Sequence, residues 1–379
     1  MAEAEQPKPE VTEAAATAQL EVPPELVASS LGEYMRAWIA RIRAGESGVL
    51  PVIGGLVLIT IVFEIISPNH VFLSAGNLVN LFQQSAVFMV LAMAEIFALL
   101  LGEIDLSIGF LGAVGGVIAV QLVQPVTTHW PWWGAIVVAL LASAAIGAFQ
   151  GTLITRLHLP SFVVTLAGLL WLQGLMLILL GLGPFSGFPS LAGQNANLLT
   201  LYHLMWGTID PTVSWVLMAV VVAGLGLTFW FRDARRRRQG LTAPPVGLTL
   251  AKIIMVAVFG IAVVAICNVN RANLGTLAGL PWVIPIVLAI LGLWTVLLER
   301  TRYGRYVYAI GGNPEAARRA GVNLARVRTL AFTLAGLTAG IGGLLYFSYL
   351  GGASNNTNGG QLVLYAVAAA VIGGTSLFG

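Results

Sequence analysis

The residues that could do chemistry in this chain are few and widely spaced. A phosphate-binding P-loop needs a lysine in a glycine-rich loop, but neither of the two lysines, Lys8 and Lys252, lies in one. Four scattered histidines without an HExxH pattern and a single cysteine, Cys267, lack the spacing of a metal site. The net charge of +3 is too small to indicate a nucleic-acid partner. We therefore predict no cofactor, no metal and no enzymatic activity in this chain.

Acidic side chains within apolar sequence are the second group of candidates, because proton- or sodium-driven transporters keep such groups near the bilayer midplane. Glu95 lies inside a predicted span, whereas Glu103 and Asp105 lie at the turn that follows it. Glu95 is thus the one candidate for a proton relay. The alternative is a structural glutamate that faces the bundle interior with a serine or glutamine partner. We favour that alternative, because no second ionisable residue is expected at comparable depth.

A short segment with helix start and stop signals is the third candidate. Asn313 is a favoured N-cap residue, Pro314 suits the first helical position, and Glu315 complements the helix dipole. Gly321 can end the helix in the left-handed conformation. The pattern predicts an exposed helix over residues 314–320, which is either a docking element or a plain connector. Its candidate contact residues are Asn313, Pro314, Glu315, Ala316, Ala317, Arg318, Arg319 and Gly321.

Membrane-spanning helices must position these residues. Charged residues make up 9% of the chain and hydrophobic residues 58%, whereas about a quarter of a soluble domain is charged. A spanning helix takes roughly 20 apolar residues. We therefore predict an all-α, polytopic inner-membrane helical bundle with about ten transmembrane helices. The spans are expected at residues 49–66, 78–101, 106–124, 132–155, 161–182, 213–231, 250–269, 281–298, 328–350 and 361–379.

The lysine and arginine positions predict the orientation of this bundle, because short cytoplasmic loops collect these residues. With the N-terminus in the cytoplasm, every lysine and arginine except Arg271 falls on the inner side. Two basic clusters are expected in inner loops, at residues 232–238 and 300–328. The outer side is predicted to carry two long neutral segments, at residues 183–212 and 351–360.

Small residues recur at intervals of four, which lets helices approach closely in lipid. Such spacing indicates a tight bundle and says nothing of a transported substrate. The residues concerned are Gly112 and Gly116, Ser143, Gly147 and Gly151, and Gly336 and Gly340.

Several motifs resemble one family of membrane proteins. GNPEAARRAG at residues 312–321 resembles the EAA loop of permease subunits of bacterial ABC importers. The Ile-x-Leu-Pro that follows in many such permeases is absent, which suits the carbohydrate (ribose/xylose) branch. GEIDLSIG at 102–109, LPSFVVTLAGLLWLQG at 159–174 and VIGGTSLFG at 371–379 resemble the same branch. The extra basic loop and span at roughly 232–270 make the arrangement most similar to the D-xylose permeases.

This resemblance implies a permease that moves a monosaccharide, D-xylose by similarity, from a periplasmic sugar-binding protein to the cytoplasm. It implies a homodimer of permeases in the inner membrane lipid, with two ATP-binding subunits that hydrolyse ATP. Residues 314–320 would lie in a groove on the ATPase, with Glu315, Arg318 and Arg319 as its main contacts. Family members continue beyond the GTSLFG at which this chain stops, so the resemblance also implies a C-terminal truncation.

For the sugar path the sequence offers polar and aromatic candidates within apolar spans. The alternative for each polar residue is an interhelical hydrogen bond, which contributes about 0.6 kcal/mol on average. Trp171 and Tyr346 could stack on a sugar ring, and the polar candidates are Gln83, Gln84, Ser85, Thr165 and Gln173.

Two regions are expected in the chain. Residues 1–45 are predicted to form a largely disordered cytoplasmic tail, because residues 1–30 contain six glutamates among Pro and Ala. Residues 46–379 form the transmembrane permease domain with its cytoplasmic coupling loop at 300–328. Two rival functions stay open at this point: a proton-coupled secondary sugar transporter that uses Glu95, and a membrane anchor without transport.

Overall fold

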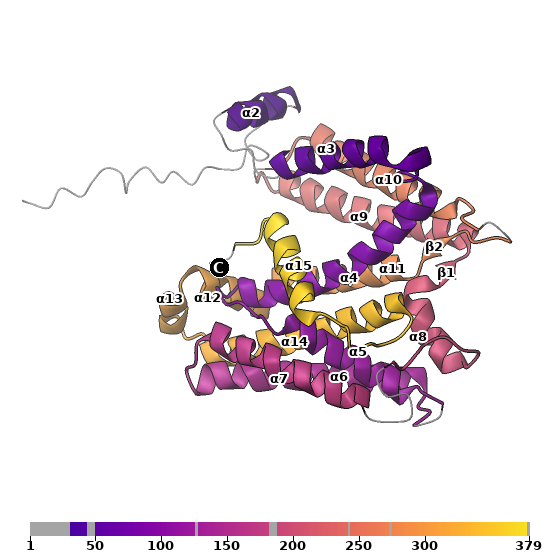
Figure 1. Ribbon diagram of the computed structural model, residues 1–379. Coiled ribbons are helices and arrows are strands. Elements are labelled where there is room, and N and C mark those ends of the chain that lie inside the picture. The colour runs from indigo at the N-terminus through magenta and orange to yellow at the C-terminus, as the bar shows by residue number, and fades with distance from the viewer. Residues whose placement is uncertain are drawn as a thin grey trace, which may run out of the picture. The chain divides into compact units, whose positions relative to one another are not determined.

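The computed structural model describes residues 31–43, 50–125, 128–181, 188–241, 243–272 and 275–376. Within them the regular secondary structure is helical apart from two short paired strands, and each predicted span overlaps a helix, although the helix at the last predicted span ends at Ile372 rather than at residue 379 (Figure 1). The elements are α2 (Leu31–Arg43), α3 (Leu50–Ile66), η2 (Pro68–His70), α4 (Ala75–Leu99), α5 (Ile108–Leu122), α6 (Trp132–Arg156), α7 (Ser161–Gly181), α8 (Ala196–Trp206), β1 (Thr208–Ile209), α9 (Pro211–Arg238), α10 (Val246–Asn268), β2 (Leu280–Pro281), α11 (Val283–Arg300), α12 (Arg302–Gly312), α13 (Pro314–Arg319), α14 (Leu324–Leu350) and α15 (Gly359–Ile372).

Seven of the described helices are long and apolar enough to cross a membrane: α4, α6, α7, α9, α10, α11 and α14. The other predicted spans are the shorter apolar helices α3, α5 and α15, of 17, 15 and 14 residues. With a rise of about 1.5 Å per residue, α15 is about 21 Å long, less than the roughly 30 Å of the hydrocarbon core. The protein is thus a polytopic α-helical membrane protein, with seven long spans and three shorter apolar helices among the residues that the structure describes.

The chain divides into two compact units, and each is described by itself. The smaller unit comprises Met1–Pro51 and Trp215–Val263, and the larger comprises Val52–Ser214 and Val264–Gly379. In the larger unit α14 is the central helix and packs along α4, α5 and α6. The short helix α5 lies in the interior of this unit and is buried along nearly its whole length. Its length suits that position, because protein rather than lipid surrounds it.

Glycines bring the central helices of the larger unit into backbone contact. A Cβ atom added at Gly343 of α14 would overlap the backbone of Gly112 in α5. One added at Gly336 of α14 would lie 2.5 Å from the carbonyl oxygen of Ser143 in α6. The tight packing predicted from the spacing of small residues is therefore confirmed at both interfaces of α14.

The smaller unit contains most of the hairpin of α9 and α10. Residues 232–238 were expected in a loop, but that expectation is wrong because they form the last two turns of α9. Asp233 is buried, and its carboxylate accepts hydrogen bonds from Thr249 Oγ1 of α10 (2.8 Å) and from Arg232 Nε (3.2 Å). Arginine is a good helix former, and its charge is favourable at a helix C-terminus. These interactions extend the helix beyond its apolar part.

Other segments expected to be irregular also contain helices. The predicted outer segment 183–212 contains α8 and β1, and its first residues lie outside the described part. In the predicted coupling loop 300–328 a helix was expected only over residues 314–320, but the loop contains α12 as well as α13. In the predicted N-terminal tail, residues 31–43 form α2, whereas residues 1–30 lie outside the described residues.

Candidate functional site

The segment 313–321 folds as its start and stop signals predict. The side chain of Asn313 caps α13, because its Oδ1 accepts a hydrogen bond from the Ala316 N–H at 2.9 Å. Pro314 is the first helical residue. Gly321 has a φ of +84°, a conformation that glycine adopts without a steric penalty. The helix ends at Arg319, one residue before the predicted end.

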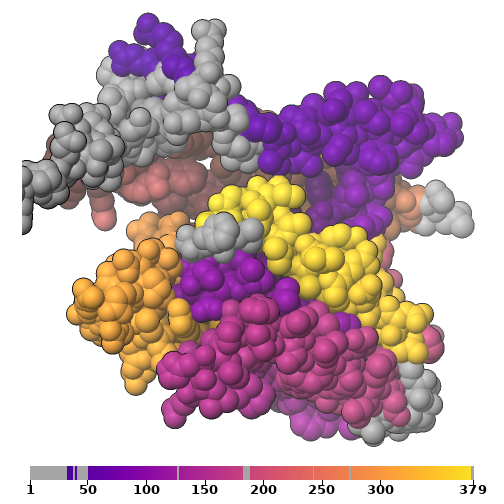
Figure 2. Space-filling model, turned by 60° about the vertical axis from the view of Figure 1, so that its left-hand side comes forward, coloured from indigo at the N-terminus to yellow at the C-terminus, as the bar shows by residue number. Residues whose placement is uncertain are grey.

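The two faces of α13 differ sharply. Ala317 is 5% exposed and packs in an apolar cluster with Val307 and Ile310 of α12. The opposite face exposes Glu315, Ala316, Arg318 and Arg319 to solvent. Figure 2 shows α12 and α13, in orange, reaching the surface of the larger unit at the left. The helix therefore has one side that packs against α12 and one side that is exposed to solvent.

Ion pairs order the exposed face of α13. Glu315 pairs with Arg318 at 2.8 Å and with Arg319 at 3.3 Å. The hydrogen bond from Arg318 holds the pKa of the Glu315 carboxyl below its usual value. The two arginines outnumber the one acid, so this face presents a net positive surface next to the methyl group of Ala316.

The apolar cluster beneath α13 joins it to three long helices. Its buried members include Phe97 of α4, Trp294 of α11 and Val327 of α14. The rings of Phe97 and Trp294 meet edge to face, with centroids 5.3 Å apart. A force on α13 would be transmitted to these helices through packed side chains, since protein interiors have low compressibility.

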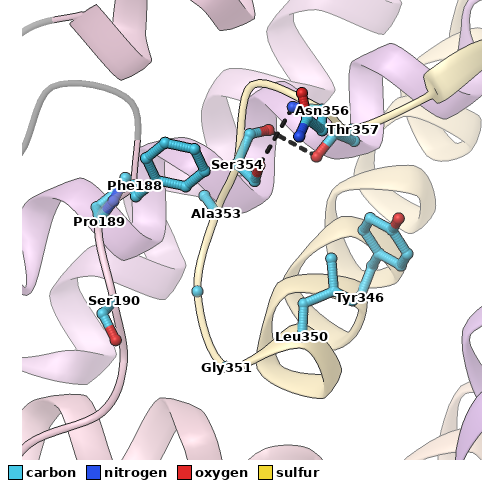
Figure 3. A pocket seen from close by; sticks show the side chains of 11 residues that line it. Phe188, Pro189, Ser190, Tyr346, Leu350, Gly351, Ala353, Ser354, Asn356 and Thr357 are labelled. Atoms are coloured by element: carbon cyan, nitrogen blue, oxygen red, sulfur yellow. Dashed lines mark hydrogen bonds between the residues drawn. The ribbon is translucent and has the colours of Figure 1, made fainter.

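A pocket of about 420 Å³ lies at the other end of α14 (Figure 3). Phe188 and Tyr346 lie on opposite sides of the loop that follows α14. Polar atoms of the pocket come from residues of this loop, among them Ser354, Asn356 and Thr357. The pocket's walls are Phe188, Pro189, Ser190, Tyr346, Leu350, Gly351, Gly352, Ala353, Ser354, Asn356 and Thr357.

Backbone hydrogen bonds hold the two walls of this pocket together. Leu191 N–H donates to the Gly351 carbonyl at 2.9 Å, and Ala353 N–H donates to the Pro189 carbonyl at 3.0 Å. The pocket is thus built from two segments that are about 160 residues apart in sequence. Aromatic and amide or hydroxyl groups around a cavity of this size suit a small polar ligand with an apolar face.

Of the seven residues predicted for a sugar path, only Tyr346 lines this pocket. Gln83 is buried, and its amide donates to the Met205 carbonyl at 2.7 Å. Thr165 is also buried and donates to the Ile104 carbonyl at 3.2 Å. Gln83 thus joins α4 to α8, and Thr165 joins α7 to the turn after α4. Both bonds fit the alternative to a sugar contact, in which these polar residues hold the bundle together. Trp171 and Gln173 are exposed on either side of the buried Leu172 of α7, and Gln84 and Ser85 are half-buried on α4.

The bond from Gln83 predicts a structural effect of substitution. In Gln83→Leu the backbone carbonyl of Met205, near the C-terminal end of α8, loses its buried hydrogen-bond donor. This loss costs about 1–3 kcal/mol of folding stability. We expect a lower thermal unfolding temperature in detergent and an unchanged sugar preference. Gln84→Leu, one residue away, is the control and should unfold at the wild-type temperature. A change in sugar selectivity without loss of stability in Gln83→Leu would instead place Gln83 on the sugar path.

Glu95 does not have the surroundings that the sequence suggests. Its Oε1 accepts a hydrogen bond from the backbone N–H of Asp105 at 3.3 Å, rather than from a serine or glutamine side chain. Asp105 is itself 1% exposed. The prediction that no second ionisable residue lies at comparable depth is therefore wrong, because the turn after α4 folds back and buries Asp105 next to Glu95.

Comparison with known proteins assigns the chain to a group of transporters. The family model described as "Branched-chain amino acid transport system / permease component" matches residues 77–379. The Xylose transport system permease protein XylH of Escherichia coli (strain K12) is 33% identical over 313 residues, 81% of this chain and 74% of that protein. XylH of Haemophilus influenzae is 32% identical over 336 residues, 85% and 81% of the two chains. The Ribose import permease protein RbsC of Escherichia coli (strain K12) is 28% identical over 347 residues, 91% and 81% of the two chains. No solved structure matches.

Proposed function

Because this chain belongs to the permease family of ABC importers, in its ribose/xylose branch, we propose that it carries D-xylose from a periplasmic binding protein into the cytoplasm. In this proposal the chain forms the membrane path, and a separate ATP-binding subunit hydrolyses ATP. The single observation that supports it most is α13, a capped helix with an exposed face and an anchored face.

The mechanism that we propose begins at α13. Its positive face and the small side chain of Ala316 fit a groove with acidic rims on the ATPase, through charge-assisted hydrogen bonds from Arg318 and Arg319. Closure of the ATPase would move α13, and the cluster around Ala317 would pass this motion to α4, α11 and α14. The bundle would then alternate between outward and inward access, as transporters do when one part of the bundle moves against another around a fixed substrate site.

The membrane arrangement follows the charge distribution. We propose that the arginine-bearing ends of α6, α9 and α11 and the N-terminus of the chain face the cytoplasm of a bacterial inner membrane. Two copies of the permease would form the path together, surrounded by lipid. Residues 188–212 and 351–358 would then face the periplasm and receive the binding protein.

The pocket near Tyr346 is the proposed site where the sugar enters the path from that side. The Tyr346 ring can stack on the apolar face of a sugar, while the Asn356 amide and the hydroxyls of Ser354 and Thr357 can bind its hydroxyls. A transport site of this kind must bind weakly, because the sugar has to leave it as readily as it enters.

Substitutions at Tyr346 test this assignment. Tyr346→Ala removes the stacking surface and is expected to raise the sugar concentration for half-maximal uptake about tenfold. Tyr346→Phe keeps the ring and should stay within about threefold of wild type. The measurement is uptake of radiolabelled xylose at several concentrations. Phe162→Ala, an exposed ring on α7, is the control. Equal uptake curves for Tyr346→Ala and this control would contradict an entry site at the pocket.

The choice of sugar is tested by competition. Vesicles that contain the permease, its ATPase and its binding protein should take up labelled xylose, and unlabelled xylose should compete better than ribose or glucose. Preferential uptake of ribose would keep the family assignment and overturn the proposed substrate. No competition by any monosaccharide would contradict the sugar proposal as a whole.

A further inference from the structure

A buried cluster of polar side chains lies where α4 turns into α5. Glu95 is 0% exposed and Asp105 is 1% exposed. The N–H and the Oγ of Ser107 both donate to Asp105 Oδ1, at 2.9 and 2.6 Å. Gln150 of α6 reaches Ser107 Oγ at 3.0 Å. One oxygen of each carboxyl is thus bonded: Glu95 Oε1 to the Asp105 backbone and Asp105 Oδ1 to Ser107.

The second oxygen of each carboxyl is buried without a hydrogen-bond partner. Among the described residues, these atoms are Glu95 Oε2 and Asp105 Oδ2. A carboxylate left in this way cannot be solvated, and an isolated buried charge is strongly unfavourable. The two residues are neighbours, because the Asp105 N–H lies 3.3 Å from Glu95 Oε1. Two buried carboxyls in one neighbourhood therefore require something that neutralises their charge.

The charged and titratable groups of the surrounding helices do not supply it. Arg328 of α14 pairs with Glu103 at 3.5 Å. Glu299 of α11 and Tyr308 of α12 line a small groove beside Ile96. Gln150 of α6 and Thr165 of α7 are neutral, and Tyr365 of α15 contacts Phe88. In the part of the chain that the structure describes, no cationic side chain forms an ion pair with Glu95 or Asp105.

We propose that Glu95 and Asp105 bind one proton between them at neutral pH, on the two oxygens that lack a partner. A proton fits this cluster better than a metal cation. A cation needs several oxygen ligands, but Ser107 Oγ is already engaged by Asp105 and Gln150. Two carboxyls that share a site cannot both ionise readily, so one proton between them is the favourable state.

The bound proton would fix the turn of residues 100–107 to α4. The same turn carries Glu103, whose partner Arg328 lies in the first turns of α14. The proton site therefore supports the contact between this turn and the helix that follows α13. This inference concerns the protonation of the fold and holds whichever sugar is carried.

Infrared spectroscopy of the purified protein in detergent tests the proposal. At pH 7 the wild type should show the C=O band of a protonated carboxylic acid, shifted in D2O, and Glu95→Gln should lack it. The glutamine keeps the acceptor for the Asp105 N–H, and its NH2 group can donate to Asp105 Oδ2. Glu103→Gln is the matched control and should retain the band. Absence of the band in the wild type would overturn the proposal by itself, as would its persistence in Glu95→Gln.

The pH dependence of stability gives a second measurement. The folded state would hold one proton that the unfolded state already releases in the acidic range, so stability falls as pH rises from that range until the folded state also loses the proton. The unfolding equilibrium should shift by up to tenfold per pH unit there. Glu95→Gln should show no such decline. Parallel pH curves for the wild type and Glu95→Gln would contradict a shared proton.

Discussion

Replacement of Ala316 by tryptophan is expected to abolish co-purification of the permease with its ATPase while leaving the permease folded. Ala316 is exposed on the free face of α13, next to Glu315 and Arg318. A tryptophan there does not disturb the cluster around Ala317, because it points away from it. It does add a large ring to the surface that is proposed to enter a close-fitting groove. Truncations of central interface residues cost about 2–4 kcal/mol, and an obstructing ring should cost at least as much, roughly a thirtyfold loss of affinity.

The matched control for this experiment is Ala196→Trp. Ala196 is an exposed alanine in the first turn of α8. α8 packs near the end of α14, where the Met205 N–H donates to Ser348 Oγ at 3.1 Å, whereas α13 precedes its start. The 27 residues of α14 separate the two sites by about 40 Å. Both variants should elute as monodisperse protein, and only Ala316→Trp should lose the ATPase. Equal recovery of ATPase with both would exclude the exposed face of α13 as the docking surface.

The second large effect is expected at Gly343. Its substitution by alanine places a methyl group on the backbone of Gly112, and backbone atoms of a packed helix cannot move aside as a side chain can. Overpacking of this kind costs about 1–3 kcal/mol, and we expect the upper end of that range. Because α5 is enclosed by other helices, the strain cannot be relieved toward lipid. The unfolding temperature in detergent should fall and uptake should fall with it.

Gly292→Ala is the control for Gly343→Ala. Gly292 lies within α11 and has nothing within 4 Å of its added Cβ. Alanine is the better helix former, so this variant should unfold at the wild-type temperature or slightly above it. If both variants unfolded at the same temperature, the backbone contact between α5 and α14 would not stabilise the bundle as described.

The sequence was informative where local chemistry decides the structure. The cap at Asn313, the left-handed turn at Gly321 and the apolar runs of the spans all depend on residues close to one another in the chain. The basic run after Phe231 was the exception, because a loop was expected where the bond between Asp233 and Thr249 extends α9. That bond joins two helices and cannot be read from the residues of either alone.

The candidate sites were harder to predict, because they depend on contacts between distant segments. Tyr346 was a candidate, but its pocket partners come from a neutral loop and from residues 188–190. The bonds of Leu191 and Ala353 that create the pocket have no signature in the sequence. Asp105 looked like a turn residue at a helix end. Its burial follows from the way the turn folds back on α4, which only the three-dimensional structure reveals.

One measurement tests the central claim, that this chain is the membrane path of an ATP-driven sugar importer. The permease, its ATPase and a xylose-loaded binding protein would be assembled in liposomes, with or without ATP on the ATPase side and with or without an imposed proton gradient. The account predicts xylose uptake that requires ATP and is unaffected by the proton gradient. Uptake that follows the proton gradient without ATP would contradict it and would indicate a proton-coupled transporter instead.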